Sequence, residues 1–129
     1  MVDVLMATYN GGKYIENQLL SLIGQTFKDW VLYIHDDGST DETIQIVKKY
    51  QKIDARILLI EDGITFGNAG LNFLHLLQFS AAQFTIFCDQ DDIWLEHKLE
   101  ALHSHLQHKE QEMYGVFCNG YAYRMEKGI

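Results

Sequence analysis

Several things are scarce in this sequence, and each scarcity excludes a class of protein. Its 129 residues contain no proline and two cysteines, so neither a proline-rich linker nor a disulfide framework is expected. No apolar run approaches the roughly 20 residues that a membrane-spanning helix needs. Basic residues are few: 10 Lys and Arg stand against 18 Asp and Glu, and the net charge of −8 argues against a nucleic-acid binder.

The rest of the composition is that of one soluble domain. Apolar residues make up 47% of the chain and charged residues 22%, which is ordinary for a globular protein, and the length suits one domain over residues 1–129. No signal peptide opens the chain, so we expect a cytoplasmic location, with peripheral contact to the inner face of the membrane in a longer form. Cys88 and Cys118 lie in apolar runs and are expected to be buried free thiols.

Five short apolar runs alternate with helical patterns. The runs are VDVLMA (2–7), WVLYIH (30–35), RILLIE (56–61), FTIFCD (84–89) and YGVFCN (114–119). Each is continuous rather than alternating, as in strands that are covered on both faces. The alternation predicts an α/β fold, a mostly parallel sheet with helices on both faces, truncated after the fifth strand. The helical stripes comprise Tyr14, Ile15, Leu19, Leu22 and Ile23; Ile44, Val47 and Tyr50; Leu71, Leu74, Leu77 and Phe79; and Leu95, Leu99, Leu102 and Leu106.

Polar residues follow the strands, where parallel α/β sheets bind their ligands. The ordinary turn and cap chemistry of Ser, Thr, Asn and Gly explains Asn10-Gly11-Gly12 and the capping stretch 39–42. It explains poorly the carboxylates Asp89, Asp91 and Asp92, because a cap needs one carboxylate. Asp89 and Asp91 project to the same side of an extended chain, and each raises the pKa of the other unless a cation lies between them. Hard divalent cations such as Mg²⁺ bind carboxylates and substrate phosphates, so this pair predicts a metal that bridges a diphosphate.

An ordered set of motifs gives the sequence a family resemblance. The stretches are VLMATYNGGKYI (4–15), LLSLIGQTFKDW (19–30), IHDDGSTDET (34–43), FGNAGLNF (66–73) and DQDDIWLEHKL (89–99). In this order they resemble the N-terminal half of family 2 glycosyltransferases, which have the Rossmann-like GT-A fold of nucleotide-diphospho-sugar transferases. The forms DQDDIW and GNAGLNF are most similar to rhamnosyltransferases that build bacterial surface polysaccharides.

The resemblance implies roles for individual residues. Tyr9 is expected to stack near the nucleotide base, and Asp37 to hydrogen-bond the base or ribose. Asp89 is expected near the ribose and metal, and Asp91 to ligate Mg²⁺ or Mn²⁺ on the diphosphate. The full set expected to bind the nucleotide sugar is Ala7, Thr8, Tyr9, Asp37, Asn68, Asn72, Asp89, Gln90, Asp92 and Trp94.

Two departures from the family pattern limit this assignment. Relatives often place a cation after the third strand to meet the donor, but GITFGNAGLNF (63–73) has none, and Asn68 or Asn72 is expected to substitute. The general base of inverting members lies well after the Asp-x-Asp motif, so we expect it beyond residue 129. Glu110 and Glu112 lie in a charged stretch that reads as a solvated helix end. The chain is therefore expected to be a donor-binding portion without the acceptor part.

The implied function is metal-dependent, inverting glycosyl transfer in cell-surface polysaccharide synthesis. The expected donor is a UDP- or dTDP-sugar, with dTDP-rhamnose as one candidate, and the acceptor is a glycan or a lipid-linked glycan. Uncovered sheet edges predict self-association. Two alternatives stay open: a noncatalytic nucleotide-sugar-binding fragment and an Asp-based phosphotransfer domain. Against the second, the first strand ends in Ala7-Thr8-Tyr9, with no acid after Asp3.

The remaining aromatic residues are given structural roles. His103, His105 and His108 are expected on a solvated helix face, and His35 in the core or at a sheet edge. Phe66 and Phe73 are expected in the core.

Overall fold

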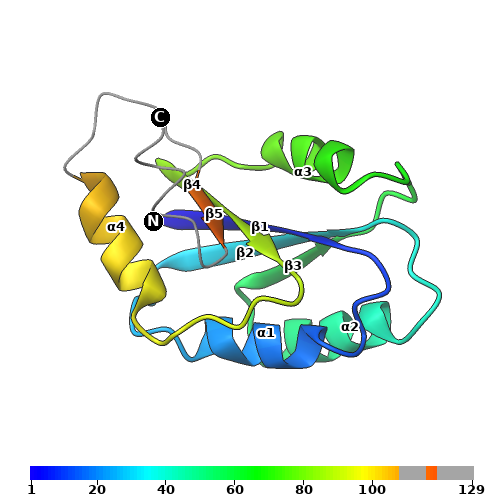
Figure 1. Cartoon of the computed structure of the whole chain (residues 1–129), viewed down its shortest axis with the longest axis horizontal. Helices are drawn as coiled ribbons and strands as arrows, with labels where there is room; N and C mark the ends of the chain where they lie inside the picture. The colour runs from blue at the N-terminus through cyan, green and yellow to red at the C-terminus, as the bar shows by residue number, and fades with distance from the viewer. Residues whose placement is uncertain (108–115, 119–129) are drawn as a thin grey trace.

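The alternating pattern of the sequence is confirmed by a computed structural model, which describes residues 1–107 and 116–118 (Figure 1). Side chains within this part are described up to residue 105. None of its helices is both long enough and apolar enough to cross a membrane. In chain order the elements are β1 (Val2–Thr8), α1 (Ile15–Ile23), β2 (Trp30–Asp36), α2 (Thr43–Ile53), β3 (Ile57–Ile60), α3 (Ala69–Leu77), β4 (Phe84–Asp89), α4 (Lys98–Gln107) and β5 (Val116–Cys118).

The described strands form one parallel sheet in the order β3-β2-β1-β4-β5. Val4 of β1 pairs with Leu32 of β2 on one side and with Ile86 of β4 on the other. The chain thus builds outward from β1 to β3 and then crosses to the opposite side of β1. The point where strand order reverses, between β1 and β4, is where open α/β sheets bind their ligands.

Helices cover both faces of the sheet, as predicted. Figure 1 shows α1 and α2 below the sheet and α3 above it. The lower face carries the apolar core, in which Val4, Leu32 and Ile86 are fully buried beneath Leu19 and other residues of the helices. The upper face is more polar, because the alternation of side chains along β1 and β2 places Asp3 and His35 there.

The predicted apolar stripe of α3 is wrong. Leu71, Leu74 and Leu77 are 48%, 63% and 39% exposed, and Phe79 beyond the helix is also exposed. The positions that α3 buries are Asn72 and Leu76, four residues apart and therefore on one face. The physical reason is a polar contact that hydrophobic spacing does not reveal: the Asn72 amide pairs with His35 on β2, which fixes the rotation of α3.

A second stripe and two phenylalanines also need correction. Leu95 is 83% exposed because α4 begins only at Lys98, whereas Leu99 is fully buried as predicted. Phe66 and Phe73 are only partly buried, since Phe66 lies in the loop before α3 and Phe73 stacks edge-on against Phe87 at a ring distance of 5.3 Å. Leu106 lies outside the described side chains.

The predictions for the histidines and cysteines are confirmed in part. His35 is buried as expected, and Cys88 is a buried free thiol that accepts a hydrogen bond from Gln18 Nε2. His103 is not solvated: its ring lies 4.6 Å from Phe27 and 5.4 Å from Phe84, and burial lowers its pKa. His105 is exposed as expected. The predictions for His108, Glu110, Glu112 and the Cys118 side chain fall outside the described residues.

Candidate functional site

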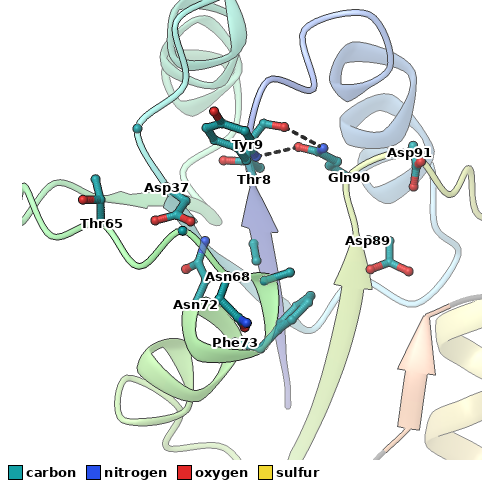
Figure 2. A pocket seen from close by; sticks show the side chains of 14 residues that line it. Thr8, Tyr9, Asp37, Thr65, Asn68, Asn72, Phe73, Asp89, Gln90 and Asp91 are labelled. Carbon is teal, nitrogen blue, oxygen red and sulfur yellow. Dashed lines mark hydrogen bonds between the residues drawn. The ribbon is translucent and has the colours of Figure 1, made fainter.

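A cavity of about 620 Å³ opens at the carboxyl ends of the strands. Its walls come from the end of β1, the turn after β2, the loop before α3 with the first turns of α3, and the end of β4 (Figure 2). It therefore lies at the reversal point between β1 and β4. Nine of the residues predicted from the sequence line it: Ala7, Thr8, Tyr9, Asp37, Asn68, Asn72, Asp89, Gln90 and Asp91.

Two predicted residues, Asp92 and Trp94, are not among those that line the cavity. Trp94 is 3% exposed and belongs to the apolar core on the lower face of the sheet. The Lys98 ammonium lies 5.1 Å from the centre of its ring and 3.9 Å from Asp92 Oδ2. In this structure both side chains are thus engaged by the first residue of α4.

The acidic wall of the cavity is electrostatically unfavourable without a cation. Burial raises the pKa of the Asp89 carboxyl, and the neighbouring carboxylates of Asp91 and Asp92 raise it further, while Lys98 partly offsets them. Asp89 ends β4 and Asp91 follows it, on the side of the cavity away from Asp37 (Figure 2). Carboxylate oxygens are the ligands that Mg²⁺ and Mn²⁺ prefer. The residues present therefore fit a hard divalent cation.

The side chain of Gln90 forms part of one wall of the cavity and pairs with the backbone of Tyr9 as a neighbouring strand would. Its side-chain amide accepts a hydrogen bond from Tyr9 N through Oε1 at 2.9 Å and donates one to Tyr9 O through Nε2 at 3.0 Å (Figure 2). This pair continues the β1–β4 pairing beyond its last register partners, Ala7 and Asp89. A Cβ atom on Gly11 would lie 2.2 Å from Gln90 Oε1, so the glycine makes room for the amide.

Asp37 holds the opposite wall. Its carboxylate accepts a hydrogen bond from the backbone N–H of Phe66, and its own N–H donates to Thr8 O at 2.8 Å. Asp37 is 9% exposed and still lines the cavity. Asp37 therefore connects the loop before α3 to the ends of β1 and β2, and this structural role does not depend on a ligand.

The loops after β1 and β2 are joined by a row of hydrogen bonds. Asn10 N donates to Ser39 Oγ at 2.7 Å, and Thr40 N donates to Asn10 Oδ1 at 2.8 Å. Gly12 N donates to Asp41 Oδ2, and Asp41 Oδ1 also accepts from Thr43 N at the start of α2, whereas the N-cap residue Glu42 makes no side-chain capping bond. The left-handed residue of the turn is Asn10, with φ of 47°, whereas the two glycines are needed for close approach.

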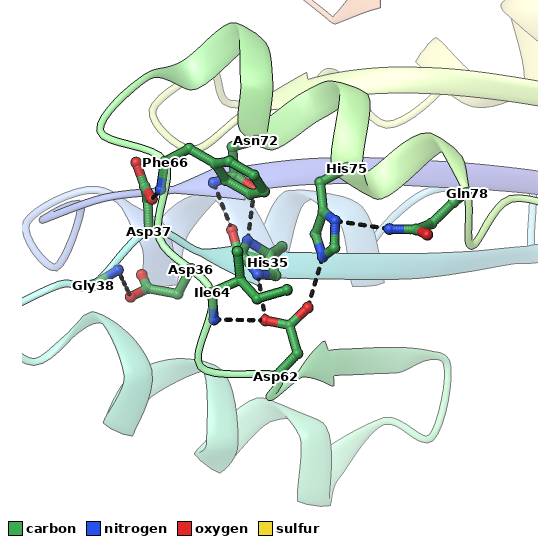
Figure 3. A network of polar contacts seen from close by, with 10 residues as sticks. All are labelled: His35, Asp36, Asp37, Gly38, Asp62, Ile64, Phe66, Asn72, His75 and Gln78. Atoms are coloured by element: carbon green, nitrogen blue, oxygen red, sulfur yellow. Dashed lines mark hydrogen bonds and ion pairs between the residues drawn. The ribbon is translucent and has the colours of Figure 1, made fainter.

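A polar network behind the cavity was not foreseen from the sequence. His35 Nε2 lies 2.8 Å from Asp62 Oδ1, and His75 Nε2 lies 2.6 Å from Asp62 Oδ2 (Figure 3). Asn72 pairs with His35 through both ends of its amide, at 2.8 Å from Oδ1 to Nδ1 and 3.0 Å from Nδ2 to the backbone oxygen. Burial acts to raise the pKa of Asp62, but hydrogen bonds from the two histidines hold it well below its usual range. No short-range spacing links these residues, so sequence pattern gave no signal.

Both asparagines that were expected to replace a donor-binding cation have structural partners. Asn72 is 1% exposed and is committed to His35. Asn68 caps α3, because its Oδ1 accepts from Leu71 N at 3.0 Å. Asn68 remains exposed at the cavity, so it is the more accessible of the two to a ligand.

Comparison with known families and sequences gives a consistent result. The family model described as glycosyl transferase family 2 matches residues 3–128. The dTDP-rhamnosyl transferase RfbG of Shigella flexneri is 40% identical over 99 residues, which are 74% of this chain and 34% of that protein. The poly(ribitol-phosphate) beta-N-acetylglucosaminyltransferase TarP of Staphylococcus aureus is 32% identical over 127 residues, covering 92% of this chain and 38% of that protein.

Solved structures show the same architecture. S. aureus TarS 1–349 in complex with UDP-GlcNAc superposes with a TM-score of 0.73 at 30% identity, covering 83% of this chain and 31% of that one. A mannosyltransferase from Pyrobaculum calidifontis in complex with GDP-Man and Mn²⁺ shares the fold at 21% identity, with a TM-score of 0.64 over 72% of this chain and 28% of that one. The chain spans about a third of the length of the curated relatives it matches.

Proposed function

Because the chain belongs to glycosyl transferase family 2, we propose that residues 1–129 are the donor-binding part of a single GT-A glycosyltransferase domain. The enzyme transfers a sugar from a nucleotide-diphosphate sugar to a glycan or lipid-linked acceptor in cell-surface polysaccharide synthesis. One observation carries this proposal. The cavity at the β1–β4 reversal brings an exposed aromatic ring, Tyr9, together with a pair of strand-end carboxylates, Asp89 and Asp91.

The residues of the cavity divide by their chemistry. The Tyr9 ring is 55% exposed and offers a surface on which a nucleotide base stacks. Asp37 accepts hydrogen bonds from the base or ribose. Asp89 and Asp91 would hold Mg²⁺ or Mn²⁺, which would supply positive charge to offset that of the diphosphate. Without a cation these two carboxylates would repel the diphosphate, so the donor set and the net charge of −8 both fit a metal-dependent donor.

The relatives narrow the proposed donor. RfbG is a dTDP-rhamnosyl transferase, and TarS is known in complex with UDP and with UDP-GlcNAc. We therefore expect a UDP- or dTDP-sugar, with dTDP-rhamnose as one candidate. We place the enzyme in the cytoplasm, at the inner face of the membrane if its acceptor is lipid-linked.

Transfer with inversion needs a base that removes the proton of the acceptor hydroxyl. We place this base beyond residue 129, so the chain alone is expected to bind donor without transferring it. A purely noncatalytic binding fragment predicts the same behaviour here but no activity in a longer protein. The phosphotransfer alternative loses support, because Asp3 lies at the amino end of β1 and its Oδ2 accepts from Ala81 N and Ala82 N.

Calorimetric titration of UDP, dTDP and GDP, with and without Mn²⁺, tests the proposal. We expect Mn²⁺-dependent binding of a uridine or thymidine diphosphate that Asp91→Ala abolishes while the unfolding midpoint stays unchanged. Asp29→Ala is the matched control, since Asp29 is an exposed carboxylate paired with the N-terminus. Equal Mn²⁺ dependence in Asp91→Ala and in the unmodified chain would refute the metal assignment.

A further inference from the structure

The network of His35, Asp62 and His75 draws three separate segments together: the end of β2, the loop after β3, and α3 (Figure 3). One ligand-type atom from each residue lies within 4.8 Å of the other two. The His35 side chain is 1% exposed, while those of His75 and Asp62 are 13% and 26% exposed. The cluster is therefore buried on one side and open to solvent on the other.

The partners of His35 fix where its protons are. Asn72 Nδ2 must donate to the backbone oxygen of His35, because a carbonyl only accepts. Asn72 Oδ1 then faces His35 Nδ1 at 2.8 Å, so Nδ1 carries a hydrogen and donates. The remaining nitrogen, Nε2, points at Asp62. In the neutral ring Nε2 bears a lone pair, which would repel the carboxylate unless a cation or a proton lies between them.

A metal ion resolves this conflict. Two imidazole nitrogens and one carboxylate oxygen form the ligand set that Zn²⁺ and similar divalent transition metals favour, whereas Mg²⁺ prefers oxygen alone. Metal-bound histidines usually donate their second N–H to an amide or carboxylate, and Asn72 already provides this contact for His35. For His75 the second nitrogen has a different contact: Gln78 Nε2 donates to Nδ1 at 2.7 Å, so the exposed Gln78 amide must turn before its Oε1 can accept from Nδ1.

We propose that His35 Nε2, His75 Nε2 and Asp62 form a three-residue site for a zinc-type divalent cation, with the fourth position open to water. Neither the family match nor the cavity requires it, and the site stands apart from Asp89 and Asp91, which lie across the cavity.

Metal binding must displace the hydrogens that lie between the two Nε2 atoms and Asp62. The Nε2 hydrogen of His35 goes to solvent, while Nδ1 keeps its hydrogen bond to Asn72 Oδ1. The His75 ring hydrogen moves from Nε2 to Nδ1, where the turned Gln78 amide accepts it through Oε1. We therefore expect Zn²⁺ binding to release protons.

The metal would act as a clip beside the cavity. Asn72 lines the cavity and is bonded to His35, and the Phe66 ring lies 5.2 Å from the His75 ring. Cross-linking the loop after β3 to β2 and α3 would therefore stiffen the wall that Asp37 holds through Phe66 N.

Zinc titration of the 129-residue chain tests the site. We expect a saturable rise of the unfolding midpoint with Zn²⁺, heat of binding that depends on the ionisation enthalpy of the buffer, and a tetrahedral-type visible spectrum with Co²⁺. His75→Gln and Asp62→Asn each keep a hydrogen-bonding side chain at the partly exposed side of the cluster. Each should weaken Zn²⁺ binding by about tenfold or more.

Two variants separate this site from others that could take the ion. His97→Gln removes an exposed histidine that lies beside Glu96 and Glu100, and it should bind Zn²⁺ like the unmodified chain. Asp91→Ala removes the proposed donor-metal ligand, and the Zn²⁺ binding that depends on His75 and Asp62 should persist in it. Absence of saturable Zn²⁺ binding, or equal affinity in His75→Gln, Asp62→Asn and the unmodified chain, would overturn the proposal. Loss of Zn²⁺ binding in Asp91→Ala alone would assign the ion to the cavity instead.

Discussion

The contact between Gly11 and Gln90 predicts that Gly11→Ala destabilises the unmodified chain but stabilises a chain that lacks the Gln90 side chain. Gly11→Ala places a Cβ where Gln90 Oε1 now lies, at 2.2 Å, and the nearest atoms are all from the Gln90 amide. The amide is the end of a flexible side chain and can swing away, but doing so breaks both of its hydrogen bonds to Tyr9. Gly11 does not have a positive φ, so alanine fits its backbone.

The magnitudes follow from these two bonds. Each is worth about 0.5–1.5 kcal/mol, and because the pair is exposed to water we expect Gln90→Ala to cost about 1–2 kcal/mol in total. Gly11→Ala loses the same bonds but restricts the unfolded chain, which returns about 0.4–1 kcal/mol. It should therefore destabilise the unmodified chain by about 0–1.6 kcal/mol.

In the Gln90→Ala background the new Cβ at position 11 no longer displaces an amide. There Gly11→Ala should stabilise the chain by about 0.4–1 kcal/mol, so the coupling energy of the double-mutant cycle is about 1–2 kcal/mol. Urea unfolding of the four proteins measures it. Gly24→Ala, which has no contact with Gln90, should have the same effect in both backgrounds. Equal destabilisation by Gly11→Ala in both backgrounds would refute the reasoning.

Three further predictions concern the cavity and the sheet edges. Asp37→Ala should weaken binding of the nucleoside diphosphate by about 1–3 kcal/mol, and calorimetry that shows no loss would leave Asp37 with only its bond to Phe66 N. Asp89→Asn should stabilise the metal-free chain at neutral pH, because folding raises the pKa of the Asp89 carboxyl. Such a carboxyl contributes most to stability below its pKa in the unfolded chain, and this contribution is lost as pH rises through its pKa in the folded chain. The advantage of Asn should therefore vanish near pH 3 in thermal melts. The chain should also self-associate through an outer strand, β3 or β5, and bind nucleotide without transferring sugar, whereas a monomer by light scattering with transfer above background would contradict both expectations.

The sheet was predictable because its information is local. Continuous apolar runs of six residues are typical of strands covered on both faces, and helical stripes between them leave a parallel sheet as the simple solution. The strand-end position of Asp89 and Asp91 was predictable for the same reason. The rotation of α3 was not, because the spacing of Leu71, Leu74 and Leu77 is as regular as that of a buried stripe. Only the distant partner His35 explains why Asn72 lies inside.

Gln90 shows a different limit of sequence reasoning. The family resemblance places it in the expected nucleotide-sugar-binding set, yet its amide serves the backbone of Tyr9, 81 positions away in the chain. Trp94 belongs to the same expected set through the DQDDIW motif, but its ring packs into the core. A motif tells which segment reaches the site, whereas the direction of each side chain depends on neighbours from other elements.

The hydrogen bonds that join the loops after β1 and β2 bear on how this cavity can be redesigned. Asn10 and Gly12 each depend on a partner among residues 39–41, and Thr40 depends on Asn10 in return. Replacing one of these two loops with that of a relative would leave polar groups of the remaining loop without hydrogen-bond partners. Attempts to change the donor by transplanting segments should therefore carry residues 9–12 and 37–43 across together, as a single cassette.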